Sequence, residues 1–259
     1  MTLAGVLWLS KAYRYGAPSK LCVTGNLFTV RMGKMEQRTL FQIGFFLLFA
    51  VATISAVPRD CTAIKRSNRR AASGVYVIQP QRSPLLVVKC VMKRNSGWTV
   101  IQRSSRASKI TWKESWTTYK YGFGDVLSDF WLGNEYIYLL TKQNRYKLRI
   151  EFLDTRNRIK YAEYSSFYIE SERGKYIIRL GTFSGNVVDQ MTQLTKNSLV
   201  DNQPFSTKDR DYDSFRRSCA ASYGGWWFDA CGRVYLNRKY PYWSGINIKK
   251  VTMMIQPTC

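Results

Sequence analysis

Three aspartates alternate along one short segment of the chain, at Asp209, Asp211 and Asp213. At this spacing several carboxylate oxygens can converge on one hard cation, and calcium prefers such oxygen ligands. The segment is not an EF-hand loop, because counting from Asp209 places Ser214 where that loop needs glycine and Ala220 where it needs a bidentate glutamate. The spacing therefore predicts a calcium site of another kind, and the competing interpretation is an aspartate-rich turn paired with neighbouring arginines.

Histidine is absent from all 259 residues. Hydrolases of the Ser-His-Asp and Cys-His types are therefore excluded, as are sites that use imidazole as a zinc ligand or proton shuttle. A glycosidase needs only a pair of carboxylates, but the chain has just 17 acidic residues and their one dense cluster is the segment described above. The composition therefore predicts a protein that is not an enzyme.

The chain carries a net charge of +23. Without residues 1–56 it keeps 34 basic and 16 acidic residues, which is a net charge of +18. Such a field concentrates polyanions, for example heparan sulfate or anionic lipid. A solvated charged surface is the competing interpretation for each group of candidate contacts. These groups are Lys65, Arg66, Arg69 and Arg70, then Arg216 and Arg217, and then Arg238 and Lys239.

The N-terminal region has the charged, apolar and small-residue order of a secretory signal peptide. Arg38 precedes an apolar run over 40–54, and Ser55-Ala56 offers a cleavage site. We therefore expect a signal peptide over 35–56, preceded by an upstream extension over 1–34 to which we assign no fold. The mature protein is then secreted into the extracellular space, where nucleic acid is not an expected partner.

A membrane anchor is the competing interpretation of the same apolar run. Residues 40–57 cover eighteen positions, and a spanning helix needs about 20. Cleavage at the small-residue pair removes the segment, so that the mature protein has no stable membrane span.

Most of the chain consists of short β-rich runs separated by Gly, Asn, Ser and Pro. The clearest runs cover 75–78, 85–88, 98–101, 147–152 and 175–180. Helical segments are few, and the best candidates are 112–119 and 133–140, the second with acidic charge near its start, where the helix dipole favours it. The pattern predicts an α+β domain with most of its aromatic side chains in the core.

Three aromatic and glycine motifs follow one another in the sequence: Gly97-Trp98-Thr99-Val100-Ile101-Gln102, Trp131-Leu132-Gly133-Asn134 and Phe205-Ser206-Thr207-Lys208-Asp209-Arg210-Asp211. In this order, with cysteines around them, they resemble the fibrinogen C-terminal globular domain over Asp60 to Pro257. The resemblance implies a mixed, mainly antiparallel β-sheet with short helices, long loops and two intradomain disulfides, placed here over 57–259. It also implies a recognition module rather than an enzyme.

Five cysteines follow the expected cleavage site: Cys61, Cys90, Cys219, Cys231 and Cys259. The resemblance implies the pairs Cys61–Cys90 and Cys219–Cys231, which their spacing also favours. Each bridge should contribute on the order of 3 kcal/mol by restricting the unfolded chain. Cys259 is then left over, and it predicts either a disulfide-linked homodimer or a capped or free thiol.

The resemblance also assigns ligands to the expected calcium site. Counted from Cys219, the side-chain ligands are Asp211 and Asp213, and the main-chain carbonyls come from Phe215 and Arg217. Arginines at this loop oppose a divalent cation unless their side chains point outward.

The ligand pocket of the family lies beside this loop, and the resemblance places it at Tyr223, Ala230, Cys231, Tyr240, Tyr242 and Trp243. Members that recognise acetyl groups carry a histidine after the second cysteine of the short bridge, where this chain has Gly232. Arg238 and Lys239 would bias an aromatic recess here toward an acidic ligand. The competing interpretation is that the pocket is lost and the rings close the core.

Together these features predict a secreted, calcium-stabilised recognition protein that binds a cell-surface receptor or an acidic glycan of the heparin type. The alternatives are a ficolin-type lectin for acetylated carbohydrate and a membrane-anchored surface protein.

Overall fold

The computed structural model describes residues 56–193 and 198–258. The expected upstream extension, the signal peptide apart from Ala56, and Cys259 lie outside the described residues. Within the described part of the chain, no helix is both long and apolar enough to span a membrane.

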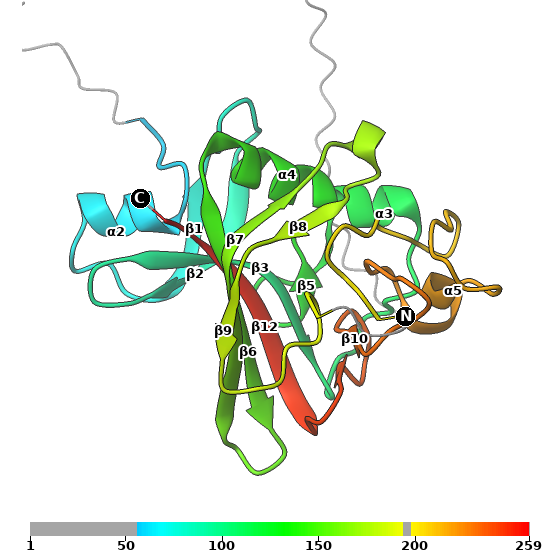
Figure 1. Ribbon diagram of the computed structural model, residues 1–259. Helices are drawn as coiled ribbons and strands as arrows, with labels where there is room; N and C mark the ends of the chain where they lie inside the picture. The colour runs from blue at the N-terminus through cyan, green and yellow to red at the C-terminus, as the bar shows by residue number, and fades with distance from the viewer. Residues whose placement is uncertain (1–55, 194–197, 259) are drawn as a thin grey trace, which may run out of the picture. The chain divides into compact units, whose positions relative to one another are not determined.

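A large antiparallel sheet forms the body of the domain (Figure 1). Its main path runs β1 (Gly74–Ile78), β2 (Leu86–Met92), β3 (Gly97–Ser105), β12 (Ile248–Pro257), β6 (Tyr146–Asp154), β7 (Ile159–Ile169) and β8 (Ile178–Leu180). Three short strands pair at its sides, namely β4 (Phe123–Gly124), β5 (Phe130–Trp131) and β9 (Phe183–Gly185). The last strand, β12, pairs with both β3 and β6 and so lies in the middle of the sheet.

The two faces of the sheet differ in character, as the alternation along β6 shows. Every second residue of β6 is buried, namely Tyr146, Leu148, Ile150 and Phe152. The residues that alternate with them are half-buried, namely Lys147, Arg149, Glu151 and Leu153. Successive side chains of a strand point to opposite faces, so one face supports the core and the other carries polar side chains. We call this second side the polar face.

Four short helices have described bounds: α2 (Cys61–Ser67), α3 (Trp116–Tyr121), α4 (Asn134–Gln143) and α5 (Cys219–Tyr223). A single-turn 3-10 helix covers Glu172–Gly174. Three of the four begin at a side chain that accepts a hydrogen bond from the first turn, namely Asp60 for α2, Ser115 for α3 and Ser218 for α5.

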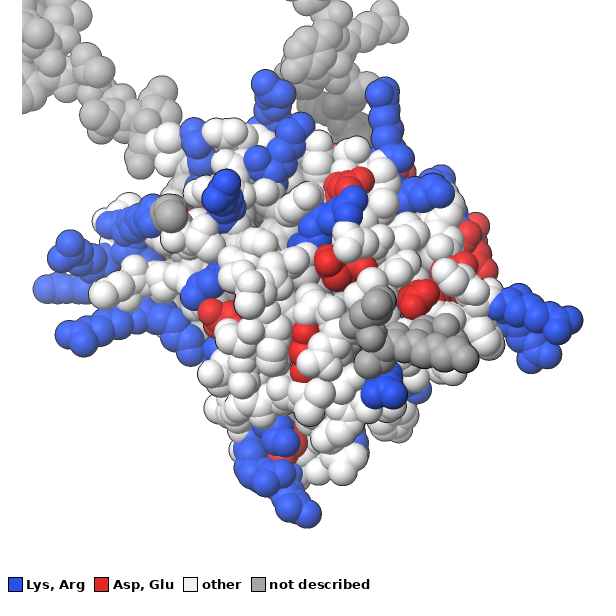
Figure 2. Space-filling model, in the orientation of Figure 1, with Lys and Arg blue, Asp and Glu red and all other residues white. Residues whose placement is uncertain are grey.

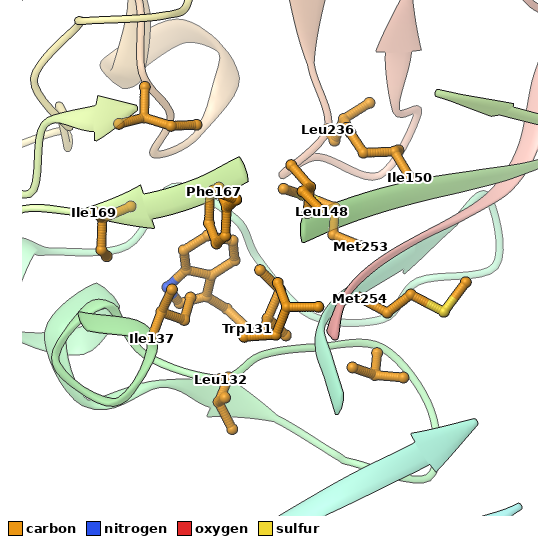
Figure 3. Close-up of a cluster of buried hydrophobic side chains, with 14 of the residues drawn as sticks. Trp131, Leu132, Ile137, Leu148, Ile150, Phe167, Ile169, Leu236, Met253 and Met254 are labelled. Atoms are coloured by element: carbon orange, nitrogen blue, oxygen red, sulfur yellow. The ribbon is translucent and has the colours of Figure 1, made fainter. Parts of the chain in front are cut away.

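The core packs α4 against the buried face of the sheet. Figure 3 shows Ile137 of α4 and Trp131 of β5 beside Phe167 and Ile169 of β7. All four side chains are buried, as is Met253 of β12.

A second group of rings joins this core to the C-terminal loops. Tyr119 of α3 lies 5.1 Å from Phe205, and Phe205 stacks on Trp131 at 5.8 Å. The Tyr119 hydroxyl donates to the carbonyl of Trp112 at 2.7 Å and accepts from the backbone N–H of Gly225 at 2.9 Å. One buried hydroxyl therefore ties α3 to the segment that follows α5.

The expected α+β fold and both expected disulfides, Cys61–Cys90 and Cys219–Cys231, are confirmed. The expected helix over 112–119 begins only at Trp116, because Ser115 caps it. The expected strand over 175–180 was wrong in its first half, since Lys175 and Tyr176 have left-handed backbone angles and the strand begins at Ile178.

Tyr119→Phe tests the junction at this hydroxyl. The substitution leaves the buried N–H of Gly225 and the carbonyl of Trp112 without their shared partner, so the free energy of unfolding should fall by about 1–3 kcal/mol. Urea unfolding followed by tryptophan fluorescence measures the loss. Tyr121→Phe, at an exposed ring in the same helix, is the control and should change little. Equal stabilities of the two variants would show that the junction is unimportant.

Candidate functional site

The acidic segment forms a loop between Thr207 and α5. Asp213 accepts hydrogen bonds from the backbone N–H groups of Phe215 at 3.0 Å and Cys219 at 2.9 Å, one on each carboxylate oxygen. Asp211 accepts from the backbone N–H of Asp213 at 3.2 Å. The two carboxylates therefore lie at the base of one loop that leads directly into the short disulfide.

Asp211 and Asp213 also face each other. The pKa of Asp213 is raised to about 6, chiefly by burial and also by the neighbouring Asp211 carboxyl, against the backbone hydrogen bond from Cys219. Two carboxylates that share one space in this way suit a divalent cation, which would neutralise both. This observation fits the expected calcium ligands, although within the described part of the chain no three acidic, cysteine or histidine side chains converge on one point.

Asp209 has a different role from its two neighbours. Its carboxylate accepts from the Thr207 hydroxyl at 2.7 Å and from the backbone N–H of Trp116 at 2.8 Å. It therefore holds the start of α3 against the loop.

The arginines of the loop point to solvent. Arg216 and Arg217 are exposed, and neither forms an ion pair with a described residue. The geometry therefore gives no support to a turn held by ion pairs between the aspartates and these two arginines. Because both arginine side chains point outward, they do not oppose a cation bound between Asp211 and Asp213.

Three tyrosine rings form a stack beyond the short disulfide. Tyr235 lies 4.6 Å from Tyr223 and 4.9 Å from Tyr242, stacked on both. The small hairpin of β10 (Val234–Tyr235) and β11 (Tyr242–Trp243) sets this arrangement, because Tyr235 and Tyr242 are paired in it. The guanidinium of Arg238 lies over Tyr223 at 5.4 Å and over Tyr235 at 5.3 Å, within cation–π range.

Two neighbouring cavities flank this stack and share Arg238 and Tyr240. We call them together the tyrosine recess. The first, of about 350 Å³, is lined by Ile110, Thr111, Trp112, Lys113, Ser222, Tyr223, Arg238, Lys239 and Tyr240. The second, of about 470 Å³, is lined by Arg106, Arg238, Tyr240, Pro241, Tyr242, Trp243, Gly245, Ile246, Asn247 and Ile248. Neither lining includes an acidic side chain among the described residues.

The structure brings together part of the expected ligand pocket. Tyr223, Tyr240, Tyr242 and Trp243 all line the recess, although Trp243 is fully buried and packs 5.0 Å from Phe152. Ala230 and Cys231, the other two expected residues, are half-buried and line neither cavity. The sequence did not predict three further residues of this region, namely Tyr235 in the ring stack and Lys113 and Arg106 in the cavity linings. Their contacts join segments that are far apart in the sequence, so they leave no local pattern in it.

The expected polyanion cluster lies at α2, far along the sequence from the recess. Arg66, Arg69 and Arg70 are exposed, whereas Lys65 donates to the carbonyl of Ala71 at 2.9 Å. Figure 2 shows Lys and Arg side chains gathered over the end of the molecule where Figure 1 places α2. From Cys61 to Lys113 the sequence has twelve Lys and Arg residues and no Asp or Glu, and this basic stretch also contributes Arg106 and Lys113 to the recess.

Comparison with known proteins gives consistent matches. The family model of the fibrinogen beta and gamma chains, C-terminal globular domain, matches residues 57–257. Fibrinogen-like protein 1-like protein of Gallus gallus is 48% identical over 194 residues, covering 73% of this chain and 68% of the chicken protein. Angiopoietin-related protein 7 of Mus musculus is 36% identical over 244 residues, covering 83% and 69%. The fibrinogen-like globe domain of human ANGPTL2 superposes with a TM-score of 0.70 at 35% identity, covering 78% of this chain and all of that domain.

These matches confirm the resemblance suggested by the motifs. Fibrinogen C-terminal domains typically bind calcium, which agrees in kind with the paired carboxylates of the acidic loop. The relatives and the shared fold place the chain in a group without enzymatic activity. The chain belongs to the fibrinogen C-terminal globular domain family and is related to the angiopoietin-related and fibrinogen-like proteins.

Proposed function

We propose that the protein is secreted and binds an acidic glycan in the tyrosine recess. The observation that carries the proposal is the charge of the recess. Lys113, Arg238 and Lys239 line its first cavity, Arg106 lines the second, and no acidic side chain among the described residues lines either. An anionic ligand would relieve the repulsion between these cations, and the tyrosine rings offer flat surfaces for a sugar ring.

Two other ligands compete with an acidic glycan. A protein receptor could use the same cations and rings, and its acidic side chains would meet them directly. Acetylated carbohydrate of the ficolin type is the second, and Gly232 at the position of the family's histidine counts against it. Secretion rests on cleavage of the expected signal peptide, and retention of that segment would make the protein a membrane-anchored surface protein instead.

We further propose that calcium stabilises the loop beside the recess. Asp211 and Asp213 would supply side-chain oxygens, and the carbonyls of Phe215 and Arg217 would complete the protein ligands, as the family resemblance implies. The loop leads into α5, which carries Tyr223. A bound cation would therefore hold one wall of the recess in place.

Arg238→Gln tests the recess. The change removes the cation above Tyr223 and Tyr235 while it keeps most of the side-chain bulk. Affinity for heparin should fall about tenfold, as expected for one charge-assisted contact, and the dependence of affinity on salt should become shallower by about one unit. Surface plasmon resonance on immobilised heparin over a series of salt concentrations measures both quantities.

The matched control is Arg145→Gln, at an exposed arginine that lines neither cavity. It removes the same charge and should leave heparin affinity nearly unchanged. If both variants lose affinity equally, heparin binds the diffuse charge rather than the recess. If Arg238→Gln keeps heparin affinity but loses calcium-dependent retention on an acetylated resin, the ficolin-type alternative is correct.

The paired carboxylates predict a pH-dependent calcium affinity. Calcium needs both Asp211 and Asp213 ionised, and the raised pKa of Asp213 means that protons compete with the cation below about pH 6. Affinity should therefore fall about tenfold from pH 7.5 to pH 5, since about a tenth of Asp213 is ionised at pH 5. Isothermal titration calorimetry at both values measures this.

Asp213→Asn should abolish calcium binding, whereas Glu114→Gln, at a half-buried glutamate of the segment before α3, should leave it intact. Calcium affinity that survives in Asp213→Asn would place the ion elsewhere in the protein.

A further inference from the structure

The polar face of the sheet carries side chains that neither the core nor the tyrosine recess uses. Lys250 and Thr252 of β12 lie on the same side of the strand as Met254, because alternate strand residues point the same way. In the register of the sheet, Thr252 is paired with Arg103 of β3 on one side and with Glu151 of β6 on the other. The centre of this face is therefore built by strands from both ends of the chain.

Charges over β6 and β7 compensate one another. Glu163 pairs with Lys147 at 3.0 Å and with Arg149 at 3.2 Å, and Arg149 also pairs with Glu151 at 3.3 Å. Arg149 further lies 4.0 Å above the ring of Tyr161. This half of the polar face thus has its cations matched by acidic or aromatic neighbours.

The half toward β2 and β3 is only partly compensated. Lys89 and Lys250 form no ion pair or side-chain hydrogen bond with any residue that the structure describes. Arg103 has one acidic neighbour, Asp129, but Nε stands 3.8 Å from Oδ1 and makes no hydrogen bond among the described residues. Its Nη1 donates to the carbonyl of Leu127 at 3.2 Å.

These three cations are close enough to act on one another. The pKa of Lys89 is lowered, first by burial and then by the charges of Arg103 and Lys250, while Asp125 acts in the opposite direction. An anion bound among the three side chains would offset the repulsion between their positive charges.

The three cations border a hollow in the sheet. It has a volume of about 210 Å³, roughly the share of seven liquid water molecules. Its lining combines the cations with Glu151, Thr252 and an apolar group made of Val91, Val100, Ile159 and Met254. It shares no lining residue with the tyrosine recess.

We propose that this hollow binds an acidic sugar residue, a ring that bears a sulfate or a carboxylate, with its anionic group at Lys89, Arg103 and Lys250. This is a second site, beyond the recess of the proposed function. It lies on the strands of the central sheet, whereas the recess is built from loops near the short disulfide.

The lining favours a sugar over a bare inorganic anion. The exposed Ile159 and the half-buried Val91 offer an aliphatic surface for the C–H face of a ring, while Glu151 can accept from a ring hydroxyl and Thr252 can donate to or accept from one. A bare anion would use only the cations. The size of the hollow suits one ring, whereas an acidic protein segment would need a longer groove to bury its backbone.

The two adjacent methionines of β12 give a local reporter. Both side chains are buried, but Met254 lines the hollow, whereas Met253 alternates to the other face of the sheet. Protein purified from cells that express the full chain, with ¹³C-methyl methionine, can be titrated with a trisulfated heparin disaccharide. The Met254 methyl resonance should shift in a saturable manner, and the Met253 resonance should stay in place.

The double variant Lys89→Gln/Lys250→Gln should weaken this response at least tenfold. Its matched control is Lys249→Gln, which removes a neighbouring exposed lysine that donates to Asn157 at 3.0 Å, and which should respond like wild type. An unchanged Met253 resonance shows that the double variant is folded. If it is shifted, the single variant Lys250→Gln gives the same test with one charge removed.

Arg238→Gln separates this site from the recess. The Met254 response should persist in that variant. A Met254 resonance that does not move, or that moves equally in the double-lysine variant, would overturn this inference and leave the recess unaffected. Inorganic sulfate that matches the disaccharide in affinity would overturn the assignment to a sugar, as would equal binding of uncharged N-acetylglucosamine.

Discussion

The last strand of the chain, β12, is hydrogen-bonded on both sides, to β3 and to β6. The strands β1 to β3 and the strands β6 to β8 are therefore joined into one sheet by β12, which follows both groups in the sequence. The same insertion positions the segment before β12, which carries Tyr235 and Tyr242 of the tyrosine stack and lines the first cavity of the recess together with residues 110–113. It also brings Lys250 next to Arg103 on the polar face. The core, the recess and the hollow all depend on this single pairing.

Much of the fold could be predicted because its local signals are strong. The run at β6 alternates clearly, those at β1 and β3 are rich in β-branched and aromatic residues, and the ordered motifs specified the family and both bridges. α2 and α5 escaped prediction because each has fewer than two turns and is specified by one capping residue, Asp60 or Ser218. The central position of β12 depends on its pairing with β3 and β6, which lie far from it in the sequence, and hydrophobic periodicity does not predict such pairings.

The candidate site, like the fold, could be predicted only where neighbouring residues carry the signal. Paired carboxylates in one loop and tyrosines near the short bridge could be read from adjacent residues. The partner of those tyrosines, Tyr235, could not, because its contacts follow from the register of a two-stranded hairpin. The hollow on the polar face combines residues from β2, β3, β6, β7 and β12, and none of them is unusual in its own segment.

The basic surface has a further origin in how the acidic residues are used. Asp60, Glu135 and Asp189 each accept a hydrogen bond from a buried tyrosine hydroxyl, at Tyr146, Tyr176 and Tyr164, and the burial of each ring raises the pKa of that tyrosine. Among the described residues, none of these three carboxylates forms an ion pair with a Lys or Arg side chain.

The insertion of β12 also affects the order in which the sheet can form during synthesis. A ribosome has made β3 and β6 before it reaches Ile248, so the emerging chain holds two unpaired strand edges until β12 has been translated. A product that lacks β12 keeps those edges open, and open strand edges are prone to pair with other chains.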